Sequence, residues 1–199
     1  MDEARFYSRV DMLREDVLSR GAALVVVENA PASTSAITEC STRLGVPLPD
    51  ELVSFLRWRN GLSISYYEDA SLAQAMPDAW SERFEIQGTT GITVLTLAVR
   101  EFFGDVAAGS PSLLEACGRL DGMVVLASEA DLVTYVRIDD RSVSSEMCPV
   151  RAFDQQRYSD WLTAPEPPVI APSIAKHVAR SVEAMIATKE TFMYWPGMQ

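Results

Sequence analysis

Histidine and cysteine, the side chains that most often bind metals or act as nucleophiles, are scarce in this sequence of 199 residues. Its one histidine, His177, excludes a metal site built from several histidines, and it flanks a predicted apolar stripe, as a packing or surface residue would. The three cysteines, Cys40, Cys117 and Cys148, lie far apart and form no CxxC or CxxH pair. No serine occurs in a GxSxG motif. The sequence therefore predicts no metal, no cofactor and no catalytic triad.

Acidic side chains are the abundant groups that could do chemistry. A pair such as Glu68 with Asp139 could serve as the acid and base of a hydrolase. In a chain with 28 acidic residues, such pairs arise without any function. The adjacent Asp139 and Asp140 offer oxygen ligands to a hard cation, but such a cation needs about six ligands and no dense loop supplies them. We interpret that pair as a turn between strands, and keep the carboxylate hydrolase as an alternative.

The stretch GTTG at residues 88–91 is the nearest approach to a phosphate-binding loop. It lacks the lysine and the spacing of a P-loop, and the third glycine of a dinucleotide-binding fingerprint. We interpret it as a hairpin turn between strands at residues 83–87 and 92–95.

The net charge of −11 is concentrated in the middle of the chain, where residues 61–170 hold 17 acidic and 7 basic residues. Binding to a nucleic-acid backbone depends on clustered Lys and Arg, and no such cluster occurs. The charge is instead complementary to a basic protein partner. The alternative is that the acidic residues simply keep the domain soluble.

The chain starts without a basic region followed by an apolar run, and its longest apolar runs, at residues 22–27 and 123–127, cannot cross a bilayer. Its unpaired cysteines suit a reducing compartment. We therefore expect a cytoplasmic protein that does not bind membranes.

Hydrophobic periodicity predicts both helices and strands. Helices are expected at residues 6–17, 34–43, 98–103, 158–162 and 174–186, and a further helix is expected to open at residues 48–51 and to end at 60–61. Besides the hairpin strands, strands are expected at residues 22–27, 63–67, 123–127, 132–138 and 147–153, the last three as an antiparallel meander. The segment 68–81 is expected to be a polar loop, and residues 165–168 a stiff linker.

Residues 37–62 read ITECSTRLGVPLPDELVSFLRWRNGL, with a Leu-Gly, a Leu-Pro, an acidic pair, a Phe-Leu and an Asn-Gly in that order. This run resembles the SUKH superfamily. The agreement continues at residues 84–88, where the family has a strand before its next helix, and in the strands near residues 122–126 and 134–139. The resemblance covers residues 33–163, most specifically 44–61 and weakly 63–81.

The resemblance implies an α+β fold with a curved, mostly antiparallel sheet and helices packed on one side. It divides the chain into a helical extension (1–32), a SUKH-like domain (33–163), and a linker with a C-terminal helix (164–199). The matched residues shape helix ends and transfer a fold, with no active site: Leu44, Gly45, Leu48, Pro49, Asn60 and Gly61.

Many bacterial members of the superfamily are immunity proteins that neutralise toxins, often nucleases or deaminases, while fungal relatives are signalling scaffolds. The resemblance therefore implies a protein-binding module that is not an enzyme and whose partner is a cognate toxin, with a regulatory scaffold as the alternative. Because loops carry binding residues, we expect the acidic residues of predicted loops to contact the partner. These are Glu68, Asp69, Asp78, Glu82, Asp139 and Asp140.

Overall fold

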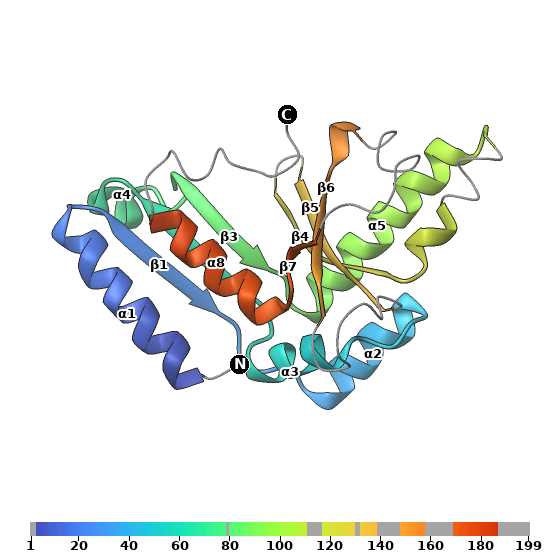
Figure 1. Ribbon diagram of the computed structural model, residues 1–199, viewed down its shortest axis with the longest axis horizontal. Helices are drawn as coiled ribbons and strands as arrows, with labels where there is room; N and C mark the ends of the chain where they lie inside the picture. Colours follow the sequence, from blue (N-terminus) through green and yellow to red (C-terminus); the bar gives the residue numbers. More distant parts are fainter. Residues whose placement is uncertain are drawn as a thin grey trace. The chain divides into compact units, whose positions relative to one another are not determined.

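The computed structural model describes residues 3–78, 80–110, 117–129, 132–138, 148–157 and 169–186 (Figure 1). Within these residues the chain forms six α-helices and seven β-strands. The pairs β1–β2, β4–β5, β5–β6 and β6–β7 are antiparallel. The helices are α1 (Glu3–Ser19), α2 (Thr34–Leu44), α3 (Asp50–Trp58), α4 (Ala70–Ala75), α5 (Thr89–Ala107) and α8 (Ile174–Ile186). The strands are β1 (Ala23–Glu28), β2 (Leu62–Tyr67), β3 (Glu82–Ile86), β4 (Met123–Glu129), β5 (Leu132–Arg137), β6 (Val150–Asp154) and β7 (Val169–Ala171). The predicted α+β class is confirmed.

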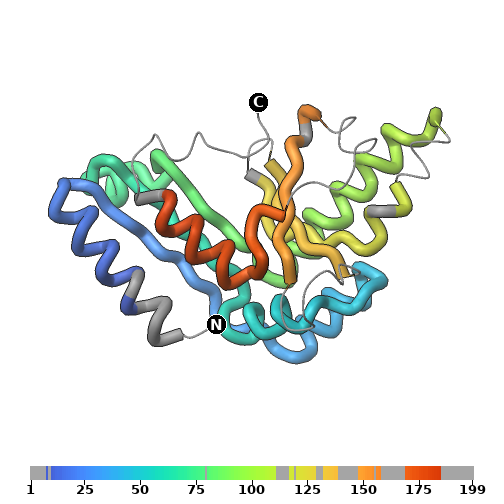
Figure 2. The backbone as a smooth tube through the Cα atoms, in the orientation of Figure 1, coloured from blue at the N-terminus to red at the C-terminus, as the bar shows by residue number. Residues whose placement is uncertain are grey.

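The chain divides into two compact units, each assembled from segments that are distant in the sequence (Figure 2). Unit 1 comprises Met1–Glu28, Leu62–Glu85 and Ala175–Gln199, and unit 2 comprises Asn29–Gly61 and Ile86–Ile174. The strands accordingly lie in two sheets, one of three strands and one of four, where the resemblance implied one sheet.

Unit 1 is built on the sheet β1-β2-β3, in which β1 and β2 pair antiparallel from Ala23 opposite Tyr67 to Glu28 opposite Leu62. Helix α1 contacts β1. It buries Val10, Leu13 and Val17, whose spacing of three and four residues places them on one helical face. The helix ends before Gly21, whose φ of 79° is the left-handed conformation that glycine adopts at little cost.

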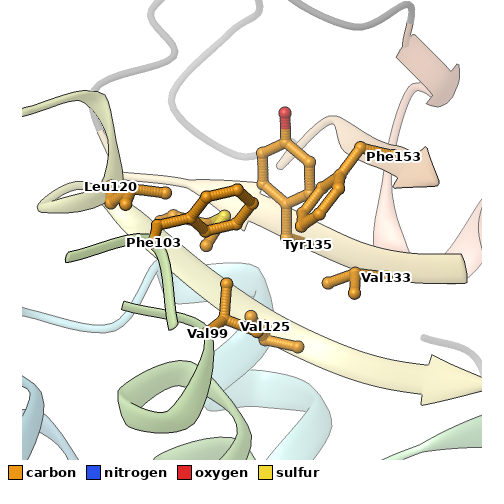
Figure 3. Packing of buried hydrophobic residues seen from close by; sticks show 8 residues of the cluster. Val99, Phe103, Leu120, Val125, Val133, Tyr135 and Phe153 are labelled. Atoms are coloured by element: carbon orange, nitrogen blue, oxygen red, sulfur yellow. The ribbon is translucent and has the colours of Figure 1, made fainter. Parts of the chain in front are cut away.

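Unit 2 is built on the antiparallel sheet β4-β5-β6-β7, with α5 against β4 and α2 against α5. Its core is a cluster in which α5 meets β4, β5 and β6 (Figure 3). The cluster consists of Val99, Phe103, Leu120, Met123, Val125, Val133, Tyr135 and Phe153. The ring of Phe153 lies 5.7 Å from that of Phe103 and 5.9 Å from that of Tyr135. The predicted meander is thus confirmed for β4, β5 and β6.

The predicted hairpin at residues 83–95 is wrong beyond its first strand, because the long helix α5 begins at Thr89, directly after its N-cap Gly88. Ile92, Val99 and Phe103 are all buried on the face of this helix that contributes to the core. The short helix expected at 98–103 is part of α5. The resemblance, which placed a helix after β3, agrees with this order of elements.

Helix α5 begins at a junction with the segment 60–61. The side-chain Oδ1 of Asn60 accepts a hydrogen bond from the backbone N–H of Thr89 at 2.7 Å, and so caps the helix from outside its own sequence. Gly88 lies so close to the backbone carbonyl of Asn60 that a Cβ atom would overlap it. Gly61 has a φ of 105°. Asn60 and Gly61 therefore shape the start of α5 as well as the chain after α3.

The remaining expected elements divide into those that the structure describes and those that lie outside it. Helix α2 matches its expected range to within one residue, with Ser33 capping it and Gly45 (φ 71°) ending it, and α3 lies between its expected start at 48–51 and its expected end at 60–61. The segment 68–81 contains the short helix α4, so it is not entirely a loop. The helix expected at 158–162 and the linker at 165–168 lie outside the described residues. Among the described helices, none has the length and apolar composition needed to cross a membrane.

Candidate protein-interaction site

Four of the acidic residues predicted to bind a partner lie in one segment of unit 1, which consists of the β2–β3 connection (residues 68–81) and the first residue of β3. Glu68, Asp69 and Asp78 are exposed, and Glu82 is half-buried. Asp139 and Asp140 lie outside the described residues. Four of the six predicted partner-binding residues thus belong to a single segment.

Local hydrogen bonds determine the first half of this connection. The carboxylate of Asp69 accepts hydrogen bonds from the backbone N–H of Ser71 at 2.8 Å and from its hydroxyl at 2.7 Å, which caps α4. These two hydrogen bonds lower the pKa of Asp69. A lowered pKa keeps the carboxylate charged and is the opposite of what a general acid needs.

Both ends of the connection are attached to the end of β2. The Tyr67 hydroxyl donates to the carbonyl of Pro77 at 2.5 Å. The N–H of Ser81 donates to the carbonyl of Tyr66 at 2.8 Å, and the Ser81 hydroxyl accepts from the N–H of Glu68 at 3.4 Å. The N–H of Ala70 also donates to the carbonyl of Gly21. These hydrogen bonds fix the described residues at both ends of the connection beside β2.

Two large apolar side chains stand exposed among these acidic residues. Met76 retains 57% of its surface and Trp80 retains 40%. The guanidinium carbon of Arg83 lies 5.9 Å from the centroid of the Trp80 ring, within the range of a cation–π contact. Arg83 is itself held by the Ser63 hydroxyl at 3.2 Å and by the Glu85 carboxylate at 3.2 Å. Arg83 thus contacts the ring of Trp80, and 40% of the Trp80 surface remains exposed to solvent.

Sequence reasoning missed Met76, Trp80 and Arg83. The signal that could have found them is composition, because Met and Trp are unusual in a segment rich in Asp, Ser and Pro. Tryptophan, methionine and arginine are also the residue types enriched in protein interfaces. The segment thus carries two exposed apolar side chains and three exposed carboxylates, a composition that suits contact with a protein surface.

Two of the scarce side chains considered for chemistry, His177 and Cys40, are buried. His177 is buried with its ring 5.2 Å from that of Phe84, and burial lowers its pKa from 6.5 to about 4. Cys40 is buried and accepts a hydrogen bond from the Thr93 hydroxyl at 3.2 Å, and burial raises the pKa of its thiol. A raised thiol pKa disfavours the nucleophilic thiolate.

The segment 44–61, on which the resemblance is most specific, contacts helix α5 through Leu44. Arg100 of α5 donates hydrogen bonds to the backbone carbonyls of Leu44 (2.8 Å), Asp121 (2.9 Å) and Met123 (3.0 Å). Burial lowers its pKa, and its guanidinium joins α2, α5 and the start of β4. Among the described residues, no group of three or more His, Cys, Asp or Glu side chains could hold a metal ion.

Comparison of the chain with models of protein families gives no match, and comparison with curated proteins gives none either.

Proposed function

We propose that this chain is a non-catalytic binding module that uses the β2–β3 connection to bind a basic protein. The observation that carries the proposal is the exposure of Met76 and Trp80 beside Glu68, Asp69 and Asp78. Carboxylates around an apolar centre accelerate association with a positively charged surface, and the aromatic anchor slows dissociation. The two kinds of residue therefore have separable effects.

The resemblance to the SUKH superfamily supports an immunity role, in which the basic partner is a toxin, such as a nuclease, that the module neutralises in the cytoplasm. The order of elements from α2 to β6 agrees with the resemblance, including the helix after β3. The finer features of that fold, sheet curvature and the packing of helices on one side of a sheet, belong to the same proposal.

The first experiment tests the immunity role by co-expression. The protein encoded beside the gene for this chain is expressed alone and together with the chain, and cell growth is measured. We expect toxicity alone and rescue by the chain. A neighbouring product that is harmless, or that stays toxic despite a soluble, folded chain, contradicts the immunity role and favours a scaffold that binds an endogenous protein.

The second experiment tests the site with that partner by measuring association and dissociation rates. The double variant Glu68→Lys/Asp78→Lys should slow association about tenfold at low salt, and added salt should narrow the difference. The control Glu15→Lys/Glu39→Lys changes the net charge equally at exposed positions elsewhere and should leave the rate nearly unchanged. Trp80→Ala should instead speed dissociation about tenfold or more, as expected for an interface anchor. Unchanged kinetics of the first variant at low salt would eliminate this site.

A further inference from the structure

Helix α5 of unit 2 has apolar side chains on its solvent-exposed face as well as on its buried face. From Thr89 to Val99 it contains no charged residue, although one side of the helix faces solvent. A helix that borders solvent ordinarily has a polar outer face. In α5 the outer face is apolar for about two turns.

The exposed apolar side chains of α5 lie on one stripe. Val94 and Phe102 retain 54% and 47% of their surface, and Leu97 retains 36%. Ala98, also exposed, lies between them on the helix surface. The spacing of three, four and eight residues from Val94 places the four side chains on neighbouring positions of the same face. Such a stripe is the pattern by which one helix packs along another.

Two acidic residues extend this stripe toward the C-terminal end of α5. Glu101 and Asp105 are exposed and lie seven and eleven residues after Val94, close to the same helical direction. Asp105 stands in the last turn, where the partial negative charge of the helix end disfavours a carboxylate, and no basic residue occupies that turn. The face therefore combines an apolar stripe with a negative end.

We propose that this face of α5, defined by Val94, Leu97, Ala98, Glu101, Phe102 and Asp105, is a second docking surface, independent of the β2–β3 connection. Its occupant is an amphipathic helix of a protein partner that presents apolar residues to the stripe and Lys or Arg to the acidic end. A second copy of the chain fits poorly, because the same six residues of another α5 offer no Lys or Arg to Glu101 and Asp105 in either alignment. A membrane surface rich in anionic lipids would repel the same carboxylates.

The probe for this surface is a synthetic helical peptide, fluorescently labelled, with Leu on one face and Lys at one end of that face. Fluorescence anisotropy with the full chain should show saturable binding. The variant Val94→Ser/Phe102→Ser should lower the affinity about tenfold or more, because each substitution removes an apolar side chain that the bound peptide would cover. The control Met12→Ser/Leu18→Ser makes the same kind of change at α1 positions that retain 58% and 64% of their surface, and should bind like the parent chain.

A charge exchange tests the acidic end. The variant Glu101→Lys/Asp105→Lys should lose affinity for the Lys peptide and gain affinity for a matched peptide with Glu in place of Lys. Circular dichroism and urea unfolding establish that each variant is folded. Absence of binding by the parent chain, equal loss in the α1 control, or failure of the charge exchange would overturn the proposal. So would α5-dependent cosedimentation with phosphatidylcholine vesicles in place of peptide binding.

Discussion

The apolar cluster of unit 2 and the β2–β3 connection of unit 1 use the same kinds of large side chain in opposite ways. Phe103, Tyr135 and Phe153 are buried to 5% exposure or less, and their rings contact one another. Trp80 and Met76 retain 40% and 57% of their surface and stand among carboxylates. The first arrangement removes apolar surface from water and stabilises the fold. The second leaves apolar surface available to a partner, so the energy of its burial contributes to binding.

Stability and recognition should therefore be separable by mutation in this chain. Substitutions in the cluster should lower the free energy of unfolding, while substitutions in the connection should change binding rates.

The largest effect is expected for Phe103→Ala, which leaves a cavity among α5, β4, β5 and β6. The free energy of unfolding should fall by about 3–5 kcal/mol, measured by urea denaturation. The neighbouring Phe102, 47% exposed, provides the matched control, because Phe102→Ala removes the same atoms from the helix surface. That control should cost about 1 kcal/mol or less. Equal losses in the two variants would show that burial does not distinguish these positions.

Unit 1 should show a dependence on pH that the cluster lacks, because His177 is buried there and none of the cluster's residue types titrates near neutral pH. Burial lowers the pKa of His177 from 6.5 to about 4, so the unfolded chain binds a proton more readily across that range. Stability contributed at this site is therefore present above pH 6.5 and is lost as the pH falls toward 4, by up to about 3 kcal/mol.

The variant His177→Leu isolates this contribution, because other groups titrate identically in both proteins. As the pH falls from 6.5 toward 4, the parent chain should lose unfolding free energy relative to the variant, and above pH 6.5 the difference between the two proteins should be constant. Parallel curves for the two proteins from pH 7 to about 4 would contradict the assignment of a neutral, buried imidazole.

An intermediate effect is expected at the start of α5. Asn60→Ala removes the acceptor that caps the Thr89 N–H and should cost about 1–2 kcal/mol of unfolding free energy. Asn60→Asp keeps an acceptor of the same shape and adds a negative charge near the helix N-terminus, so it should recover most of that loss. Urea unfolding of both variants decides, and an Asp variant as unstable as the Ala variant would contradict the capping role.

The same junction explains which elements could be predicted from the sequence. Helix α2 was predictable because its cap, Ser33, and its terminating Gly45 are adjacent to it in the chain. The first half of helix α5 was wrongly predicted as a turn and a strand because its side-chain cap comes from Asn60, 29 residues away. Its first turns also contain Ile92, Thr93 and Val94, which are β-branched and favour strands. Tertiary packing of the buried face outweighed that local preference.

The candidate site was predictable in part for a similar reason. Charged residues in a segment rich in turn-forming residues are expected on the surface, and Glu68, Asp69 and Asp78 are exposed there. Whether a Trp or a Met is buried depends on which element packs over it, and the sequence around Trp80 contains no periodic pattern to indicate this. The exposure of Trp80 could be established only from the folded chain.

The smallest effect on stability is expected within the β2–β3 connection. Asp78→Lys replaces an exposed side chain and should change the unfolding free energy by no more than about 0.5 kcal/mol. The same substitution should slow association with a basic partner, and more strongly at low salt. Phe102→Ala, an exposed position in unit 2, should likewise cost little stability but should leave the association rate unchanged. A large loss of stability in Asp78→Lys would mean that the connection contributes to folding, and the division between a stabilising cluster and a recognition segment would no longer hold.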